Sequence, residues 1–274
     1  MRDSDGNRAA GFIEAGFLAL LLVILIAAAL WLFFQRVWWF PELASARSLA
    51  VDRLFELTLL ITGIAFVMVH GALAFFIVRF RDRGTGRALF WHDSHALEIS
   101  WSVVTLVILT VLVFMGQRVW SDVYFSKAPD NAVLVEVTGE QFMWHARYPG
   151  SDGAFGATDP KLITNTNILG LDKRDPAARD DVVVDNTLHL PVNRPARIRL
   201  RAKDVIHSFY LPHFRTKQDA VPGMTIEIWI VPSREGQFEI VCAELCGLGH
   251  YRMKAMLTVE SQEAYDKWLK EQAG

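Results

Sequence analysis

Cysteine, histidine and methionine side chains gather near the C-terminal end of the chain. Two thiols, an imidazole and a thioether fall within twelve residues, at Cys242, Cys246, His250 and Met253. A further histidine, His207, comes 35 residues before the first cysteine, just after a predicted strand. Soft thiolate and thioether ligands together with imidazole select copper or zinc over magnesium or calcium. The spacing therefore predicts a site for a soft metal ion.

Several kinds of site compete for these residues. A zinc finger pairs its histidines at H-x3–5-H, whereas here the two histidines are 43 positions apart and a methionine joins them. A mononuclear blue-copper site uses one cysteine and leaves the second unexplained. A Cys242–Cys246 disulfide would suit the oxidising side of a membrane, but it leaves the histidines and the methionine without a role. Two copper ions that share both thiolates use every residue.

The elements that must carry this site begin with three apolar blocks. Residues 15–34 and 99–116 contain no charge, and residues 57–78 contain His70 as their only ionisable side chain. A helix needs about 20 apolar residues to cross the hydrocarbon core of a bilayer, so each block qualifies. We expect an anchor of residues 1–120 with transmembrane helices near 12–36, 54–80 and 97–119.

The first block has a second interpretation, a cleaved signal peptide. Its apolar length exceeds that of a typical signal, and Asp3, Asp5 and Glu14 dilute the positive charge that a signal needs. An Ala44-Ser45-Ala46 triplet resembles a cleavage site but lies about ten residues beyond the block. We expect the helix to be retained.

Basic residues predict the orientation of the anchor. The loop between the second and third blocks carries Arg79, Arg81, Arg83 and Arg87, which marks it as cytoplasmic. The N-terminus then lies inside and everything after residue 120 lies outside. The loop between the first two blocks holds three arginines, so the contrast in charge is modest.

From residue 121 to residue 274 the pattern is that of a water-soluble β domain. Short runs alternate between apolar and polar residues, as half-buried strands do. They lie at residues 133–137, 181–184, 196–201, 224–231, 237–241 and 255–259. Turn residues separate many of them, which favours a small antiparallel sandwich or barrel. We expect residues 151–180 to form a long surface loop and Ser261 to cap a final helix.

Composition narrows the class of protein. The chain of 274 residues is 52% hydrophobic and 21% charged, which excludes a disordered chain and argues against a wholly soluble one. The formal net charge of −2 gives no support to nucleic-acid binding. Two cysteines are too few for an iron–sulfur cluster, and no C-x-x-C-H sequence is present for covalent haem.

These motifs together resemble a known family. The pattern Cys-x-Glu-x-Cys-x3-His-x2-Met, with Asp-Val-x-His-Ser-Phe upstream, closely resembles subunit 2 of cytochrome c oxidase, which carries the binuclear CuA centre of haem–copper oxidases. The resemblance extends from about Ala44 to Trp268. It includes Leu97-Glu98-Ile99-x-Trp101 and Val221-Pro222-Gly223.

The resemblance implies a fold and a ligand set. It implies a membrane-anchored cupredoxin-like Greek-key barrel. It implies that two copper ions bind the side chains of His207, Cys242, Cys246, His250 and Met253 and the carbonyl oxygen of Glu244. The Glu244 side chain would reach a magnesium ion shared with subunit 1, and Glu98 would lie near the entrance of a proton channel. For His70 it implies no role.

The function that follows is acceptance of single electrons from a cytochrome c-type donor, which are passed to haem in subunit 1 for oxygen reduction coupled to proton pumping. The expected partners are subunits 1 and 3 and membrane lipid, in a bacterial inner membrane with the β domain on the periplasmic side. Two alternatives remain, a CuA-bearing subunit of a nitric-oxide reductase and a membrane-anchored copper carrier. A quinol-oxidase subunit would lack the copper ligands.

Two features depart from the family pattern. Most relatives have two transmembrane helices, so the first block is an addition. The family motif Gly-x-Gln-Trp-x-Trp reads Gly-Glu-Gln-Phe-Met-Trp here, with Phe142 in place of the tryptophan through which electrons arrive and Trp144 retained. We therefore expect a tightly associated or differently charged haem donor.

Overall fold

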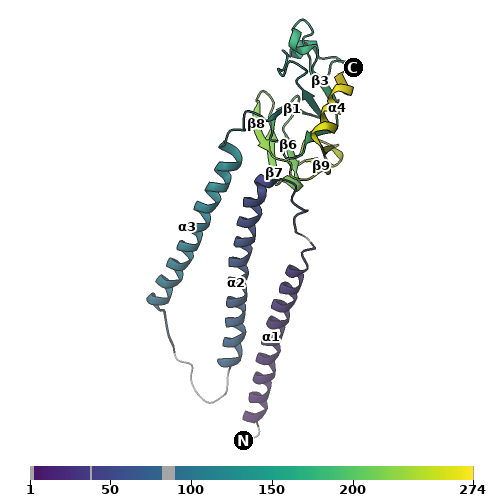
Figure 1. The fold of residues 1–274 in the computed structure, drawn as a ribbon. Helices are drawn as coiled ribbons and strands as arrows, with labels where there is room; N and C mark the ends of the chain where they lie inside the picture. The colour runs from purple at the N-terminus through teal and green to yellow at the C-terminus, as the bar shows by residue number, and fades with distance from the viewer. Residues whose placement is uncertain (1–2, 38, 82–89, 274) are drawn as a thin grey trace. The chain divides into compact units, whose positions relative to one another are not determined.

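The computed structural model describes residues 3–37, 39–81 and 90–273 of the chain (Figure 1). Contacts divide it into two compact units. One contains Met1–Trp39 and Asp52–Gln117, and the other contains Phe40–Val51 and Arg118–Gly274. Residues 40–51 thus group with the β domain, although they lie between two apolar blocks in the sequence.

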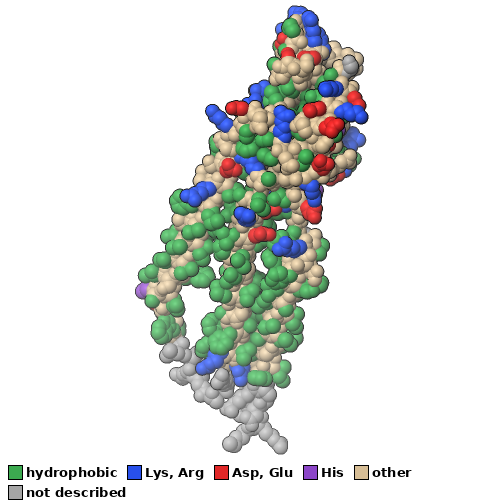
Figure 2. Space-filling view, in the orientation of Figure 1, with side chains coloured by type: hydrophobic (Ala, Val, Ile, Leu, Met, Phe, Trp, Pro, Cys, Tyr) green, Lys and Arg blue, Asp and Glu red, His purple; other side chains and the backbone are tan. Residues whose placement is uncertain are grey.

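Three long helices make up the apolar part of the chain. They are α1 (Asp3–Phe34), α2 (Leu49–Arg79) and α3 (His95–Phe125), and among the described residues these three are long and apolar enough to cross a membrane. Their large apolar side chains are mostly exposed in the isolated chain, as Figure 2 shows by the hydrophobic cover over the helices. Such a surface needs lipid or partner helices around it. The three expected helices are confirmed, each longer than its apolar block because polar residues continue it.

In the described part of the chain, ten strands form two five-stranded sheets. The first sheet has the order β3-β2-β1-β5-β8 and the second the order β4-β10-β9-β6-β7. Their bounds are β1 (Val133–Glu140), β2 (Met143–Tyr148), β3 (Val182–Asp185), β4 (Thr187–Pro191), β5 (Ala196–Ala202), β6 (His207–Leu211), β7 (Thr216–Ala220), β8 (Ile226–Ile230), β9 (Gly236–Cys242) and β10 (Lys254–Glu260). The pairs β1–β5 and β4–β10 are parallel, so the expectation of a purely antiparallel domain was wrong in these two places.

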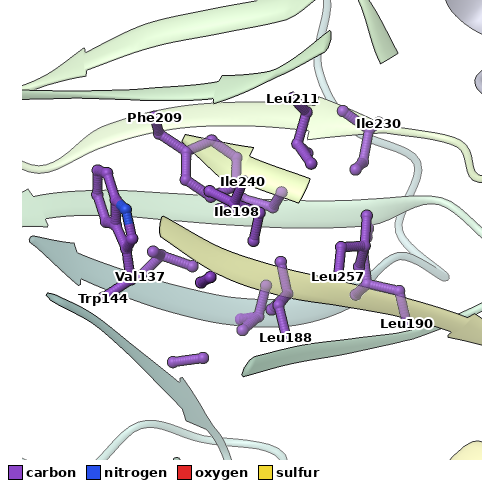
Figure 3. Packing of buried hydrophobic residues seen from close by; sticks show 14 of the residues in the cluster. Val137, Trp144, Leu188, Leu190, Ile198, Phe209, Leu211, Ile230, Ile240 and Leu257 are labelled. Atoms are coloured by element: carbon purple, nitrogen blue, oxygen red, sulfur yellow. The ribbon is translucent and has the colours of Figure 1, made fainter. Parts of the chain in front are cut away.

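The core lies between the two sheets and follows from alternation along the strands. In β5, Ala196, Ile198 and Leu200 are buried, and the arginines between them point outward. Most of the residues labelled in Figure 3 are aliphatic, and the rings of Trp144 and Phe209 lie toward one end of them; the wider buried set also contains the rings of Tyr148, Phe214, Phe238 and Tyr265. The Trp144 and Phe209 rings pack edge to face, with centroids 5.7 Å apart. This end of the core therefore contains an aromatic pair.

The final helix, α4 (Gln262–Ala273), begins where the sequence predicted. The Ser261 hydroxyl accepts a hydrogen bond from the Ala264 N–H at 3.2 Å, as an N-cap does. Trp268 stacks on the His189 ring, with centroids 3.9 Å apart and the planes nearly parallel. The stack holds α4 against β4, the edge strand of the second sheet.

The β2–β3 loop, residues 149–181, is more than a surface loop, because it covers the outer face of the first sheet. Phe155 packs against the guanidinium groups of Arg147 and Arg199, at 4.9 and 5.6 Å. Arg147 is 2% exposed and forms ion pairs with Asp181, whose side chain is fully buried, and with Glu136 at 3.4 Å. This loop therefore covers a buried network of ion pairs centred on Arg147.

Arg147→Met should lower the free energy of unfolding of the β domain by about 3 kcal/mol, because two buried carboxylates would lose their cation. Chemical denaturation of the domain measures this. Arg174→Met is the matched control in the same loop, since Arg174 pairs with Asp172 at the exposed surface, and its midpoint should not move. Equal effects of the two substitutions would show that the buried network is not what holds the loop.

Candidate metal centre

The candidate ligands lie on two neighbouring strands and the loop that joins β9 to β10. His207 begins β6, Cys242 ends β9, and the loop from Ala243 to Met253 contains the other residues. The loop returns to its own start, because the Cys242 N–H donates to the Met253 carbonyl at 3.1 Å. The Ala243 N–H donates to the Ser208 carbonyl at 3.0 Å and ties the loop to β6. Backbone pairing thus brings the two distant parts of the motif together.

The donor atoms converge on the two thiols. Cys242 Sγ and Cys246 Sγ lie 3.9 Å apart, and both cysteines are free. His207 Nδ1 lies 3.9 Å from Cys242 Sγ, and the Glu244 carbonyl oxygen lies 3.1 Å from it. On the other side, His250 Nδ1 and Met253 Sδ lie 3.7 and 3.6 Å from Cys246 Sγ. The structure brings together all six groups that the sequence predicted.

Burial suits soft-metal ligation. His207, Cys242, Cys246 and Met253 are each 8% exposed or less. Burial, together with the neighbouring thiol, raises the pKa of Cys246 to about 11. The metal-free thiol is therefore protonated at neutral pH, and a thiolate forms there only against a bound cation.

The donor set distinguishes between the kinds of site left open by the sequence. Neither cysteine is disulfide-bonded, and both thiols face nitrogen, oxygen or thioether donors. Two thiolates and a thioether are soft ligands and two imidazoles are intermediate ones, and with a single carbonyl oxygen beside them they fit copper.

Asp204 orients the first histidine. Its Oδ1 accepts a hydrogen bond from His207 Nε2 at 2.8 Å, which leaves Nδ1 facing the thiols. Its Oδ2 accepts the Gln141 N–H at 2.8 Å. Partial burial alone would raise the pKa of Asp204, but the donors from His207, Gln141 and Val205 hold it below its ordinary value. A carboxylate behind a ligating histidine fixes its tautomer and ring orientation.

The turn between β1 and β2 packs against the ligand loop, residues 243–253. The Gln141 side-chain amide donates to the Cys246 carbonyl. The Phe142 ring occupies the space where a side chain at Gly249 would begin, since a Cβ there would lie 2.4 Å from the ring. Gly247 has a φ of +138°, which other residues rarely adopt, and a Cβ there would also meet this turn. Both glycines are therefore needed for the turn to reach the loop.

Trp144 and Phe142, the two aromatic residues singled out from the sequence, both adjoin the ligands. Trp144 is 2% exposed and its ring lies edge-on to the His207 ring, with centroids 5.9 Å apart. Phe142 is half-buried and covers the ligand loop from outside. Asp204 and Gln141 received no role from the sequence, although an aspartate three residues before a ligating histidine was a signal that could have revealed the first.

Glu98 and His70 lie on helices of the other compact unit, not in the β domain. Glu98 lies in the first turn of α3, exposed, with its carboxylate 3.3 Å from His95 Nδ1. His70 Nδ1 donates to the Phe66 carbonyl one turn earlier, at 2.8 Å. The helix itself therefore supplies one partner for this intramembrane histidine.

Gly249→Ala should abolish or strongly weaken copper binding, because the new methyl group would collide with the Phe142 ring and displace the ligand loop. Copper titration followed by absorption measures the effect. The double variant Gly249→Ala with Phe142→Ala removes the collision and should recover binding. Failure of the second change to rescue the first would mean that the ring does not set the position of the loop.

Comparisons with known proteins agree on one family. Residues 29–119 match the family described as cytochrome c oxidase subunit II, transmembrane domain, and residues 133–260 match its periplasmic domain. The alternative cytochrome c oxidase subunit 2 of Bradyrhizobium diazoefficiens is 39% identical over 254 residues, which cover 92% of this chain and 90% of that protein. Cytochrome c oxidase subunit 2 of Cereibacter sphaeroides is 31% identical over 248 residues, 86% of this chain and 80% of that protein.

Among solved structures, the periplasmic domain of subunit II (CoxB) of Bradyrhizobium japonicum aligns with 53% of this chain and 96% of its own, at 29% identity and a TM-score of 0.40. The expected architecture, a helical anchor followed by a cupredoxin-like β domain, is confirmed. The chain belongs to the cytochrome c oxidase subunit 2 family.

Proposed function

We propose that this chain accepts single electrons at a binuclear CuA centre and passes them to haem in subunit 1 of a haem–copper terminal oxidase. The observation that carries the proposal is the convergence of two imidazoles, a thioether and a carbonyl oxygen on two thiols 3.9 Å apart. Two copper ions bound there would supply a one-electron carrier, which side chains alone do not provide.

Hydrogen bonds within the chain hold the candidate ligands in position. His207, Cys242, Cys246, His250 and Met253 would ligate through side chains, and Glu244 through its carbonyl. Asp204 holds the His207 ring, and the Gln141 amide holds the carbonyl of Cys246. Because these hydrogen bonds position the ligands, a change of charge at the centre would need little movement of the protein. A copper carrier would need exposed, exchangeable ligands, so the burial of this site argues against that alternative.

The copper count tests the proposal. The full-length protein loaded with copper should bind two ions per chain, turn purple and show one unpaired electron delocalised over both ions in electron paramagnetic resonance. Cys246→Ser should abolish that signal, because one bridge would lose its soft thiolate. A spectrum of one isolated copper at full occupancy would contradict the binuclear site.

Glu244→Gln is the matched control, since it changes the side chain and keeps the backbone carbonyl. The copper spectrum should therefore survive. The Glu244 side chain is exposed, and we propose that it contributes to a magnesium site at the contact with subunit 1. In the assembled oxidase, Glu244→Gln should weaken the binding of manganese used in place of magnesium, and unchanged manganese binding would refute this second role.

The donor side of the centre is the surface around Phe142. Its ring touches the ligand loop, so we propose that electrons arrive there from a cytochrome c-type donor. Residues 121–274 contain 18 basic and 21 acidic residues, a difference of −3, which gives only mild steering of a basic protein. A permanently associated haem donor fits this weak field better than a freely diffusing one.

Turnover with a freely diffusing basic cytochrome c should accordingly be slow and only weakly dependent on ionic strength. Phe142→Trp should raise the rate, because indole offers a larger π-surface to a haem edge. Steady-state oxidation measured over a range of salt concentrations checks both expectations. Fast turnover that falls steeply with salt would contradict a permanently associated donor. An unchanged rate in Phe142→Trp would show that electrons do not arrive through position 142.

We also propose that α1 is retained as a third spanning helix in a bacterial inner membrane, with the N-terminus inside and the β domain in the periplasm. The segment that follows α1 supports this, because it is built into the β domain. Ala44 is fully buried, its N–H donates to His213 O at 2.8 Å, and its carbonyl accepts the Ser233 N–H at 2.9 Å. Cleavage within the Ala44-Ser45-Ala46 triplet would remove or sever part of this packed segment.

N-terminal sequencing of the purified protein decides the matter. The mature chain should begin at or near Met1, and the intact mass should include α1. A mature terminus near Arg47 would show that the first block is a processing signal.

A further inference from the structure

The last turn of α3 ends beside the β domain without a cation of its own. The final four carbonyls of a helix have no partner within it, and the negative end of the helix dipole favours a cation there. No basic residue lies in the last turn of α3. The Ser126 hydroxyl satisfies the Asp122 carbonyl at 2.5 Å. A cation from another part of the chain would complete this helix end.

Arg47 supplies that cation from the segment Phe40–Val51. Its guanidinium donates to the carbonyls of Asp122 and Val123 and to the Ser126 hydroxyl. The Asp122 carboxylate lies 3.6 Å away and adds an ion pair. The Arg47 side chain is only 9% exposed, whereas the Asp122 carboxylate is 61% exposed, so the ion pair between them adds little and the hydrogen bonds of the guanidinium carry the joint.

The same guanidinium reaches the β domain. Its central carbon lies over the Trp229 ring of β8, 3.6 Å from the ring centroid, and the guanidinium donates to the Trp229 carbonyl at 3.0 Å. The Trp229 indole N–H donates to the Ser126 carbonyl at 2.9 Å. One planar, five-donor side chain therefore joins three segments, a geometry that lysine does not reproduce.

Two of these segments, the one before α2 and the end of α3, are the places where the chain enters and leaves the β domain. Arg47 precedes α2 by two residues, and residues 122–126 lead out of α3. The Ser48 hydroxyl donates to the Phe214 carbonyl, and the Tyr124 hydroxyl donates to the Lys217 carbonyl. Both connections are therefore hydrogen-bonded parts of the domain rather than flexible linkers.

We infer that Arg47 is a positioning residue for electron transfer out of the copper centre. This inference rests on the proposed function. The rate at which an electron leaves for haem depends steeply on the separation of the two centres. A joint that fixes both connections of the β domain limits the variation of that separation, whereas a loosened joint would let the domain tilt.

The test uses the assembled oxidase. In Arg47→Met, the copper spectrum, the copper potential and the KM for the donor should stay unchanged, because no ligand or docking residue is altered. Transfer from copper to haem, timed after flash photoreduction, should slow by about fivefold or more per assembled complex, since small misplacements of reacting groups carry large rate penalties. Arg47→Lys keeps the charge without the planar fork and should give an intermediate rate.

Arg53→Met is the matched control, because it removes the same charge from an exposed position on α2. It should transfer electrons at the wild-type rate. A rate in Arg47→Met or Arg47→Lys equal to that of Arg53→Met, with copper intact, would overturn the inference and leave the proposed function standing. Absence of the binuclear copper signal from the wild-type oxidase would instead overturn the proposed function.

Discussion

The loop from Ala243 to Met253 must bring metal-binding groups near both of its ends into contact with His207 on the neighbouring strand β6. Contacts from several parts of the β domain hold the loop in this position. The loop closes on itself through the Cys242 N–H and the Met253 carbonyl. It is then held from outside by the turn that carries Gln141 and Phe142. Two thiols so close together in a buried site repel each other once ionised, so both would stay ionised only with bound positive charge nearby.

Contacts of the β1–β2 turn with the ligand loop and of β1 with His207 explain why glycine occupies positions 249 and 139. Gly249 leaves room for the Phe142 ring, and Gly139 leaves room for the rings of His207 and Trp144, since a Cβ there would lie 2.8 Å from the imidazole. The turn, the histidine and the ligand loop thus form one packed unit, which Asp204 closes by bonding to two of the three parts. Substitution of the family tryptophan by phenylalanine preserves this packing and alters mainly the surface offered to a donor.

The sequence predicted the parts that local pattern encodes. Three apolar blocks of sufficient length became three helices, and the ligand set could be predicted because four soft or intermediate donors within twelve residues are typical of a metal site. What escaped prediction depends on pairs far apart in the chain. The bond between Gln141 and Asp204 spans 63 positions, and the parallel pairing of β1 with β5 leaves no mark in either strand's alternation. The polar edge strand β7 also lacks the apolar pattern by which strands are predicted.

X-ray absorption at the copper edge of the loaded, full-length protein can show whether both thiols are shared between two copper ions. We expect two copper ions per chain, each with two sulfur neighbours at bridging distance, and a clear copper–copper scattering contribution. One copper per chain, or two coppers without mutual scattering, would contradict it.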